Sequence, residues 1–86
     1  MKLVWSSHAW EDYLYWQTND KSTLKKINAL IKDIQRSPFE GLGKPESLKY
    51  ALSGYYSRRI DHEHRLVYSC DQENIYIVQC RFHYDI

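Results

Sequence analysis

The chain has 86 residues, of which 43% are hydrophobic and 15% aromatic, and its formal net charge is +1. This length suits one small domain with a modest core, which buries only about 60% of the surface that the unfolded chain exposes. The composition excludes a disordered chain, and the even spread of charge excludes a basic tail for nucleic acid. No run approaches the roughly 18 apolar residues of a membrane span. Because Met1 leads into structure without a signal-peptide pattern, we expect a single cytoplasmic domain over residues 1–86.

The first forty residues predict a short strand followed by two helices. Residues 2–5 are an apolar run that suits a strand, and the two serines after it can cap a helix. Apolar side chains then recur at helical spacing, which predicts a helix over about 7–18 and a second helix that begins after Asp20. Pro38 ends the second helix, because the residue before a proline disfavours the α region.

Residues 38–54 form a long connection that contains both prolines and all three glycines of the chain. A stretch of this length without a regular element is uncommon in a compact domain and often functional. Because Pro45 suits the first position of a helix, residues 45–48 are expected to form one helical turn. Such a turn would hold Glu46 in a fixed position.

The last thirty residues predict three consecutive strands, at 55–60, 63–70 and 74–84. The expected fold class is therefore α+β, with two N-terminal helices packed on one face of a small antiparallel sheet. The other face collects ionisable side chains, namely Arg59, Glu63, Arg65, Arg81 and His83. A purely structural sheet does not need this concentration, so we interpret that face as the working surface.

The register of the second hairpin decides which side chains share this surface. A three-residue turn at 72–74 pairs Arg65 with Arg81. The face toward the helices is then apolar: Leu66, Tyr68, Cys70, Tyr76, Val78, Cys80 and Phe82. The opposite face carries Arg65, Val67, Ser69, Ile75, Ile77, Gln79, Arg81 and His83. A turn of two or four residues would place Arg65 and His83 on opposite faces, because side chains alternate along a strand.

The first hairpin leaves a similar choice open. A three-residue turn at 60–62 places Arg59 on the face of Glu63 and Arg65, whereas a two-residue turn places Arg58 there. Both arginines therefore remain candidates for the working surface.

A braced carboxylate, a strand arginine and a histidine at the end of a neighbouring strand are the parts needed for metal-free phosphodiester cleavage. One group removes the proton of the nucleophile, one neutralises charge on the phosphoryl oxygens and one protonates the leaving oxygen. RNA carries its own nucleophile, the 2′-hydroxyl beside the scissile phosphate. The natural assignment makes Glu46 the base, Arg65 the phosphate stabiliser and His83 the acid, with Lys49 and Arg59 as further cations.

Each of these residues also has a simpler explanation. Glu46 could only complement a helix dipole. Arg65 could form a surface ion pair with Glu63, which contributes about 0–1 kcal/mol. His83 could be a solvated histidine near the end of the chain, since its usual pKa suits catalysis without proving it.

No metal or cofactor is expected. His62, His64, Cys70 and Cys80 lack the paired C-x-x-C or H-x-x-x-H spacing that holds zinc. Both cysteines fall inside predicted strands, where reduced thiols acting as small apolar side chains are expected.

Several runs of the sequence are specific in combination: MKLVWSSHAWEDYLYWQ, KKINALIKDIQRSPFEGLGKPESLK, LSGYYSRRIDHEHRLVY and CRFHY. Together they closely resemble the YoeB toxins of the Txe/YoeB family, within the wider RelE-like group of ribosome-dependent messenger-RNA endoribonucleases. The resemblance covers nearly the whole chain. It implies a bacterial cytoplasmic protein, a homodimer and neutralisation by a YefM-like antitoxin. It also implies cleavage in the ribosomal decoding site, which leaves a cyclic phosphate on the upstream fragment.

The resemblance assigns roles by position. The family's general base, phosphate-binding arginine and general acid match Glu46, Arg65 and His83, and Tyr84 matches a residue that holds or stacks on substrate. Secondary positions on the same surface match Lys49, Arg59 and Glu63. Unlike most of the family, this chain continues past His-Tyr with Asp85-Ile86, which adds a negative charge beside the site. The alternative to an endoribonuclease is a non-catalytic module of the same fold that binds the ribosome or the antitoxin.

Overall fold

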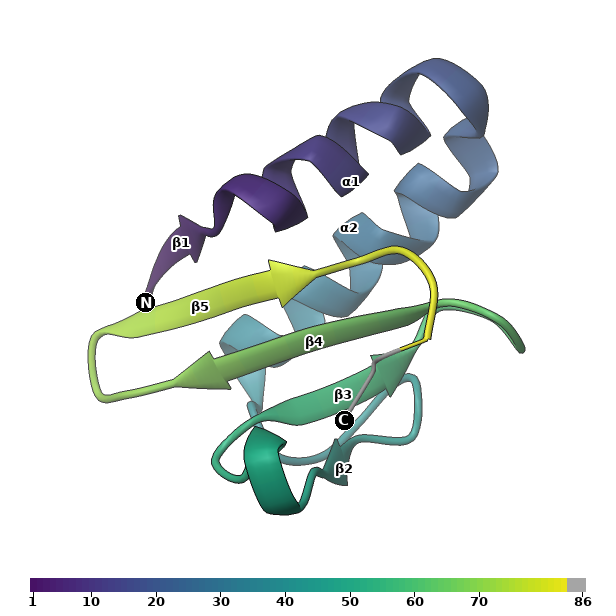
Figure 1. The fold of residues 1–86 in the computed structure, drawn as a ribbon. Helices are drawn as coiled ribbons and strands as arrows, with labels where there is room; N and C mark the ends of the chain where they lie inside the picture. Colours follow the sequence, from purple (N-terminus) through teal and green to yellow (C-terminus); the bar gives the residue numbers. More distant parts are fainter. Residues whose placement is uncertain (84–86) are drawn as a thin grey trace.

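The structure is a computed structural model that describes residues 1–83. The elements in chain order are β1 (Lys2–Trp5), α1 (Ser7–Asn19), α2 (Lys21–Arg36), β2 (Glu46–Ser47), the 3-10 turn η1 (Tyr50–Leu52), β3 (Tyr56–Arg59), β4 (Arg65–Cys70) and β5 (Asn74–Gln79). The sheet order is β1-β5-β4-β3-β2, and only the β1–β5 pair among these strands is parallel. Both helices pack on one side of this sheet (Figure 1), which confirms the expected α+β class.

The two helices begin where the sequence predicts. The Ser6 hydroxyl accepts a hydrogen bond from the N–H of Ala9 at 3.0 Å, and the Asp20 carboxylate accepts one from the N–H of Thr23 at 3.1 Å. These side chains satisfy donors that a helix start leaves without partners. Neither helix, nor any other in residues 1–83, is long and apolar enough to cross a membrane.

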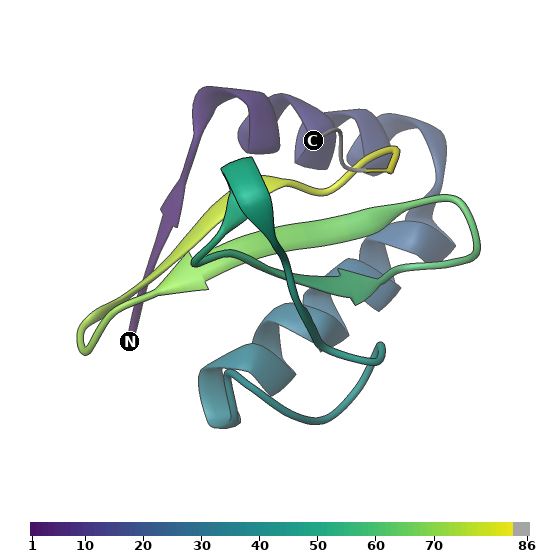
Figure 2. The same ribbon diagram turned by 60° about the horizontal axis from the view of Figure 1, so that its bottom comes forward.

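The main core lies between the helices and the sheet. Its fully buried members are Ala9, Ile27, Leu30, Ile34, Leu66, Tyr68, Ile75, Ile77 and Cys80. Burying one such Leu or Ile side chain contributes about 1.5–3 kcal/mol. The sheet face that points away from α1 and α2 is called the outer face below; in Figure 2 the segment with η1 lies in front of it, while α2 lies behind the strands.

The second hairpin differs from its prediction. Cys70 pairs with Ile75, and the N–H of Asp71 donates to the carbonyl of Asn74 at 3.0 Å. The turn is therefore the two residues 72–73, and the predicted three-residue turn is wrong. The physical reason is the Asp71 carboxylate, which accepts two backbone N–H groups of the turn at 2.8 Å and so stabilises the tighter loop.

This register moves the isoleucines of β5 to the helix side. Ile75 and Ile77 are fully buried in the core, whereas the prediction placed them on the outer face. The residues that instead alternate outward are Tyr76 and Val78. A bulge then shifts the register so that Val67 pairs with Gln79, and Cys80 returns to the core.

The first hairpin places Arg59 opposite Arg65. The N–H of Ile60 donates to the carbonyl of His64 at 3.0 Å, so the three-residue turn is 61–63, one residue later than predicted. Side chains directly opposite each other in an antiparallel pair project to the same face. Arg59, rather than its neighbour Arg58, therefore shares the outer face with Arg65.

The predicted helical turn at 45–48 is also wrong. Glu46 and the residue after it are extended and form β2, in which Glu46 pairs with Ser57 of β3. The helical turn comes later, at η1. Glu46 is thus braced as expected, but by strand pairing at the edge of the sheet.

Candidate active site

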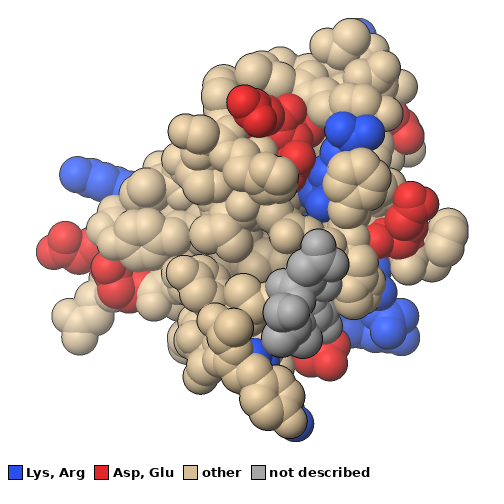
Figure 3. All heavy atoms as spheres, in the orientation of Figure 1, with Lys and Arg blue, Asp and Glu red and all other residues tan. Residues whose placement is uncertain are grey.

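Pairing across four strands aligns one row of residues on the outer face: Glu46, Ser57, Val67 and Gln79. The next row, two residues further along β3 and β4, is the Arg59–Arg65 pair. Figure 3 shows charged groups of both signs on the right-hand side of this view, and further charged groups at the left-hand edge. The edge strand with Glu46 and the two arginines therefore bring opposite charges to one surface.

The guanidinium of Arg65 is held by the turn before its own strand. Its Nη1 donates to the carbonyls of Asp61 at 2.7 Å and His64 at 3.1 Å, and the residue is only 9% exposed. Burial alone would raise the pKa of Asp61, but bonds from the N–H groups of His64 and Glu63 outweigh it and hold the pKa below its usual value. The Asp61 carboxylate is therefore charged at neutral pH and holds the turn closed. This turn keeps the guanidinium of Arg65 in a fixed position.

Residues 80–83, called the C-terminal segment below, leave the regular sheet and are tied down by side chains. The N–H of Cys80 donates to Asp12 Oδ2 at 3.0 Å, and its carbonyl accepts from Trp16 Nε1 at 2.8 Å. The N–H of Arg65 donates to the carbonyl of Phe82 at 3.0 Å. The segment turns across the start of β4 toward β3 (Figure 1), and His83, which follows Phe82, is exposed there.

The predicted strand to residue 84 and its Arg65–Arg81 pair are therefore wrong. β5 ends at Gln79, and the guanidinium of Arg81 lies over the ring of Tyr15 on α1, 3.4 Å from its centroid. Phe82, expected on the apolar face, is 53% exposed. The bulge and the hydrogen bonds to α1 direct residues 80–83 away from the regular strand. Their side chains therefore do not alternate between the two faces as the prediction assumed.

Two other predicted residues, Glu63 and Lys49, lie in connections between strands. Glu63 lies in the turn before β4, where its Oε1 is 3.6 Å from His64 Nε2, and not in the strand as predicted. Lys49 is exposed in the loop after β2, immediately before η1. Tyr84 lies outside the described residues.

The side chains that hold the C-terminal segment were missed by the sequence analysis. Asp12 is 6% exposed and lies on the same helical face as Ala9 and Trp16. A carboxylate on an apolar stripe is the signal that could have found it, because a buried charge needs a partner.

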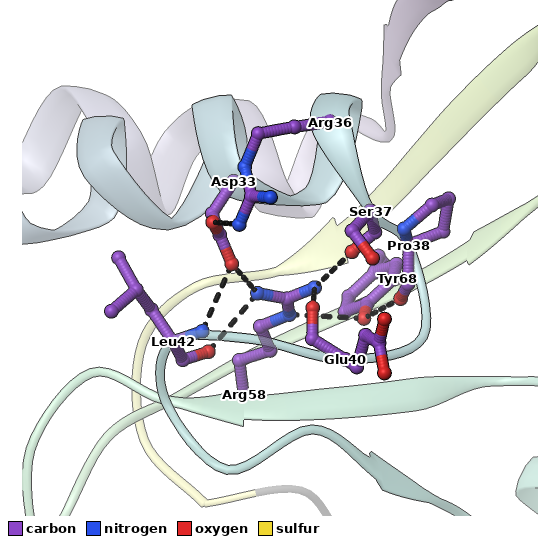
Figure 4. A network of polar contacts seen from close by, with 8 residues as sticks. All are labelled: Asp33, Arg36, Ser37, Pro38, Glu40, Leu42, Arg58 and Tyr68. Atoms are coloured by element: carbon purple, nitrogen blue, oxygen red, sulfur yellow. Dashed lines mark hydrogen bonds and ion pairs between the residues drawn. The ribbon is translucent and has the colours of Figure 1, made fainter.

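A second missed feature is a buried network around Arg58 (Figure 4), whose side chain is fully buried. Its guanidinium makes five hydrogen bonds of 2.5–3.2 Å, to the Tyr68 hydroxyl, the Asp33 carboxylate and the carbonyls of Ser37, Glu40 and Leu42. Through them Arg58 fastens the end of α2 and the connection after it to β3. That connection leads directly to Glu46.

The Asp33 carboxylate gives this network a predictable acid sensitivity. Three hydrogen bonds hold the pKa of Asp33 well below the ordinary value of about 3.9. The bond from Arg36 has the largest effect, followed by those from the Leu42 N–H and from Arg58. A depressed folded-state pKa adds stability that is present above the unfolded pKa and lost as pH falls through the folded one. We expect urea midpoints to decrease from pH 5 to pH 2, and to decrease less for Asp33→Asn. Equal decreases in both proteins would contradict this role.

In the part of the chain described, no group of three or more His, Cys, Asp or Glu side chains could hold a metal ion. Cys70 and Cys80 are both free thiols, as expected, and burial raises the pKa of Cys80 to about 12.

Solved structures of small α+β toxins share this fold. The YoeB/ParE toxin from Agrobacterium tumefaciens superposes with a TM-score of 0.94 at 51% identity, covering 98% of this chain and 100% of that one. A family model described as the YoeB-like toxin of bacterial type II toxin-antitoxin systems matches residues 5–84. This chain belongs to that family.

Individual relatives match this chain over nearly its full length. Toxin YoeB of Escherichia coli (strain K12) is 61% identical over 84 residues, which are 98% of this chain and 100% of the relative. A YoeB dimer from Staphylococcus aureus has a TM-score of 0.92 at 55% identity and covers 98% of both chains. A heterotetrameric YoeB-YefM toxin-antitoxin complex from the same organism has a TM-score of 0.91, with the same identity and coverage.

Proposed function

We propose that this chain is a ribosome-dependent endoribonuclease that cleaves messenger RNA in the decoding site and thereby inhibits translation. The observation that carries the proposal is that Glu46 and Arg65 share one face of the sheet, while the segment that contains His83 is bonded to Arg65. Glu46 and Arg65 lie on the outer face, and the residue before His83 is hydrogen-bonded to the backbone of Arg65. These three positions match the base, phosphate-binding and acid positions that the family resemblance implies.

The proposed reaction is attack by the 2′-hydroxyl on the adjacent phosphate. Glu46 removes the proton from this hydroxyl, the 2′-oxygen bonds to phosphorus, and the bond to the 5′-oxygen of the next nucleotide breaks. Arg65 and Arg59 neutralise the non-bridging oxygens, and His83 gives a proton to the departing 5′-oxygen. The products are a 2′,3′-cyclic phosphate and a 5′-hydroxyl, with Glu46 left protonated and His83 neutral.

The remaining site residues bind substrate in this proposal. Lys49, exposed next to the strand of Glu46, adds a cation for the RNA backbone. Glu63 stands in the turn that frames Arg65, and Tyr84 stacks on an unstacked base, as aromatic side chains do with single-stranded nucleic acid. No metal and no cofactor takes part.

Its partners follow from relatives. We propose that a YefM-like antitoxin binds this chain, because the S. aureus relative forms a YoeB-YefM complex. We also propose a homodimer, since a core of this size favours a second subunit and the S. aureus relative is a dimer. The ribosome, in the bacterial cytoplasm, presents the message to the site.

The decisive experiment uses ribosomes programmed with a defined message. The purified chain is expected to cut the message in the decoding site and to leave a 2′,3′-cyclic phosphate on the upstream fragment. A message with a single 2′-deoxynucleotide just upstream of the cut should stay whole, because it lacks the nucleophile. Cleavage of the deoxy message, or a product that ends in a 3′-hydroxyl, would overturn the mechanism. Ribosome binding with every message intact would favour the non-catalytic module.

A further inference from the structure

We propose that His64, a residue with no role in the proposed reaction, is a positioning residue that presents His83. The inference rests on the proposed function. It concerns how the C-terminal segment is held at the residue immediately before the acid.

The central contact joins the first hairpin to the C-terminal segment. The backbone N–H of Phe82 donates to His64 Nδ1 at 2.7 Å. A ring nitrogen that accepts a hydrogen bond carries no proton, so this contact requires the ring proton to be on Nε2. The Nε2 atom lies 3.6 Å from Oε1 of Glu63, which suits a nitrogen that bears hydrogen.

The residue held by this bond has an unusual backbone. Phe82 has φ of 65°, in the left-handed region that side chains other than glycine disfavour. Such a conformation persists only where surrounding contacts fix it. Here one fixing contact is a side-chain acceptor on His64, and Gln79 Nε2 also donates to the carbonyl of Phe82 at 3.2 Å. The turn that these contacts stabilise sets the direction in which His83 leaves.

The same residue is also held from the other side. The carbonyl of Phe82 accepts from the N–H of Arg65 at 3.0 Å, and Arg65 Nη1 donates to the carbonyl of His64 at 3.1 Å. Two consecutive residues thus bind both polar groups of the Phe82 backbone. Arg65, the proposed phosphate-binding residue, and His64 are therefore bonded to the same backbone and to each other. A change in His64 alters the distance between Arg65 and His83.

The ring of His64 has a packing role that the test must separate from its acceptor role. It stands edge-on to Trp16 with centroids 4.9 Å apart, lies 5.8 Å from the Phe82 ring, and is 13% exposed. The two roles are separated by comparing two variants. One keeps an aromatic ring but loses the acceptor, and the other keeps an acceptor but loses the ring.

The first test compares His64→Phe with His64→Asn. Phe keeps an aromatic ring against Trp16, whereas the side-chain oxygen of Asn can reach the place of Nδ1. We expect His64→Phe to lower kcat on programmed ribosomes by roughly 10–100-fold with KM unchanged, because small misplacement of a catalytic group has effects of this size. His64→Asn should stay within a few-fold of the unmodified chain despite a lower Tm. His62→Phe, in the exposed part of the same turn, is the matched control.

The opposite order would overturn the proposal: if His64→Asn is the slower variant and activity follows Tm, His64 acts only by packing. A second measurement does not depend on cleavage. Nitrogen-15 spectra at pH 8 should show an unprotonated Nδ1 and a proton on Nε2 of His64, with slow exchange of the Phe82 amide. A proton on Nδ1 would remove the contact on which the inference stands. If the unmodified chain leaves messages whole, the proposed function fails while this spectrum still decides the contact.

Discussion

Replacing Glu46 with Ala or His83 with Gln is expected to lower the single-turnover rate of message cleavage on programmed ribosomes by roughly 10²–10⁴-fold each. The first change removes the group that takes the 2′-hydroxyl proton, and the second removes the proton donor for the 5′-oxygen. Neither should weaken ribosome binding by a comparable factor, because both groups act mainly in the transition state. The rate is measured by quenching a saturated ribosome complex and sizing the fragments.

The controls for this prediction are exposed residues in the turns of the two hairpins. Glu73→Ala removes an exposed carboxylate in the β4–β5 turn and is the control for Glu46→Ala. His62→Gln makes the same substitution as His83→Gln at an exposed histidine in the β3–β4 turn. Both should cleave like the unmodified chain. Because paired acid and base groups act as a unit, the double variant of Glu46 and His83 should lose less than the product of the single losses. Undiminished cleavage by either single variant would refute its assignment.

Replacing Arg58 with Met should destabilise the fold by about 3–5 kcal/mol, the usual effect of removing one partner from a buried ion pair. The change leaves the Asp33 carboxylate without its buried cation, and it strips donors from three carbonyls of the connection after α2. A domain of ordinary stability has only 5–15 kcal/mol in total. The loss is measured as the free energy of unfolding in urea.

Arg59 offers a matched control for this prediction. It is the next residue in the same strand, but its side chain is exposed on the outer face. Arg59→Met should therefore change stability by about 0.5 kcal/mol or less, as surface substitutions usually do. It should instead weaken cleavage, because a cation is lost beside Arg65. Similar losses of stability in the two variants would show that the buried network contributes little.

The helices were predictable from the sequence because their signals are local. Ser6 and Asp20 sit beside the N–H groups that they cap, and the apolar stripe of α2 repeats at a fixed spacing. The position of Arg65 on the outer face also followed from strand alternation. Glu46 is held in place as expected, but by pairing of β2 with β3 and not by the helical turn predicted.

The register of β5 was not predictable in the same way. It depends on one carboxylate, Asp71, which closes a two-residue turn, and on a bulge between the pairs of Val67 and Tyr68. The two shifts compensate, so Cys80 still reaches the core as predicted while Ile75 and Ile77 change sides. Alternation alone cannot reveal a bulge, because it assumes an unbroken period of two.

The bonds that hold the site together join residues distant in sequence. Asp33 and Arg58 are 25 positions apart, and Asp12 and Cys80 are 68 apart. Between the adjacent arginines of β3, alternation says that one points inward and one outward, and only the turn geometry decides which. Such pairings depend on tertiary structure, so a single sequence shows them only as polar residues on apolar faces.

The position of β5 in the sheet sets the order of events when the polypeptide is made. It is the last strand in the sequence, yet it lies between β1, the first element synthesised, and β4. Until it emerges, β1 has no strand to pair with, and α1 lacks the strand that it covers. Contacts of such long sequence separation slow folding and delay it until synthesis is nearly complete. A nascent copy of this toxin therefore remains unassembled, and its site unformed, while most of it is still being translated.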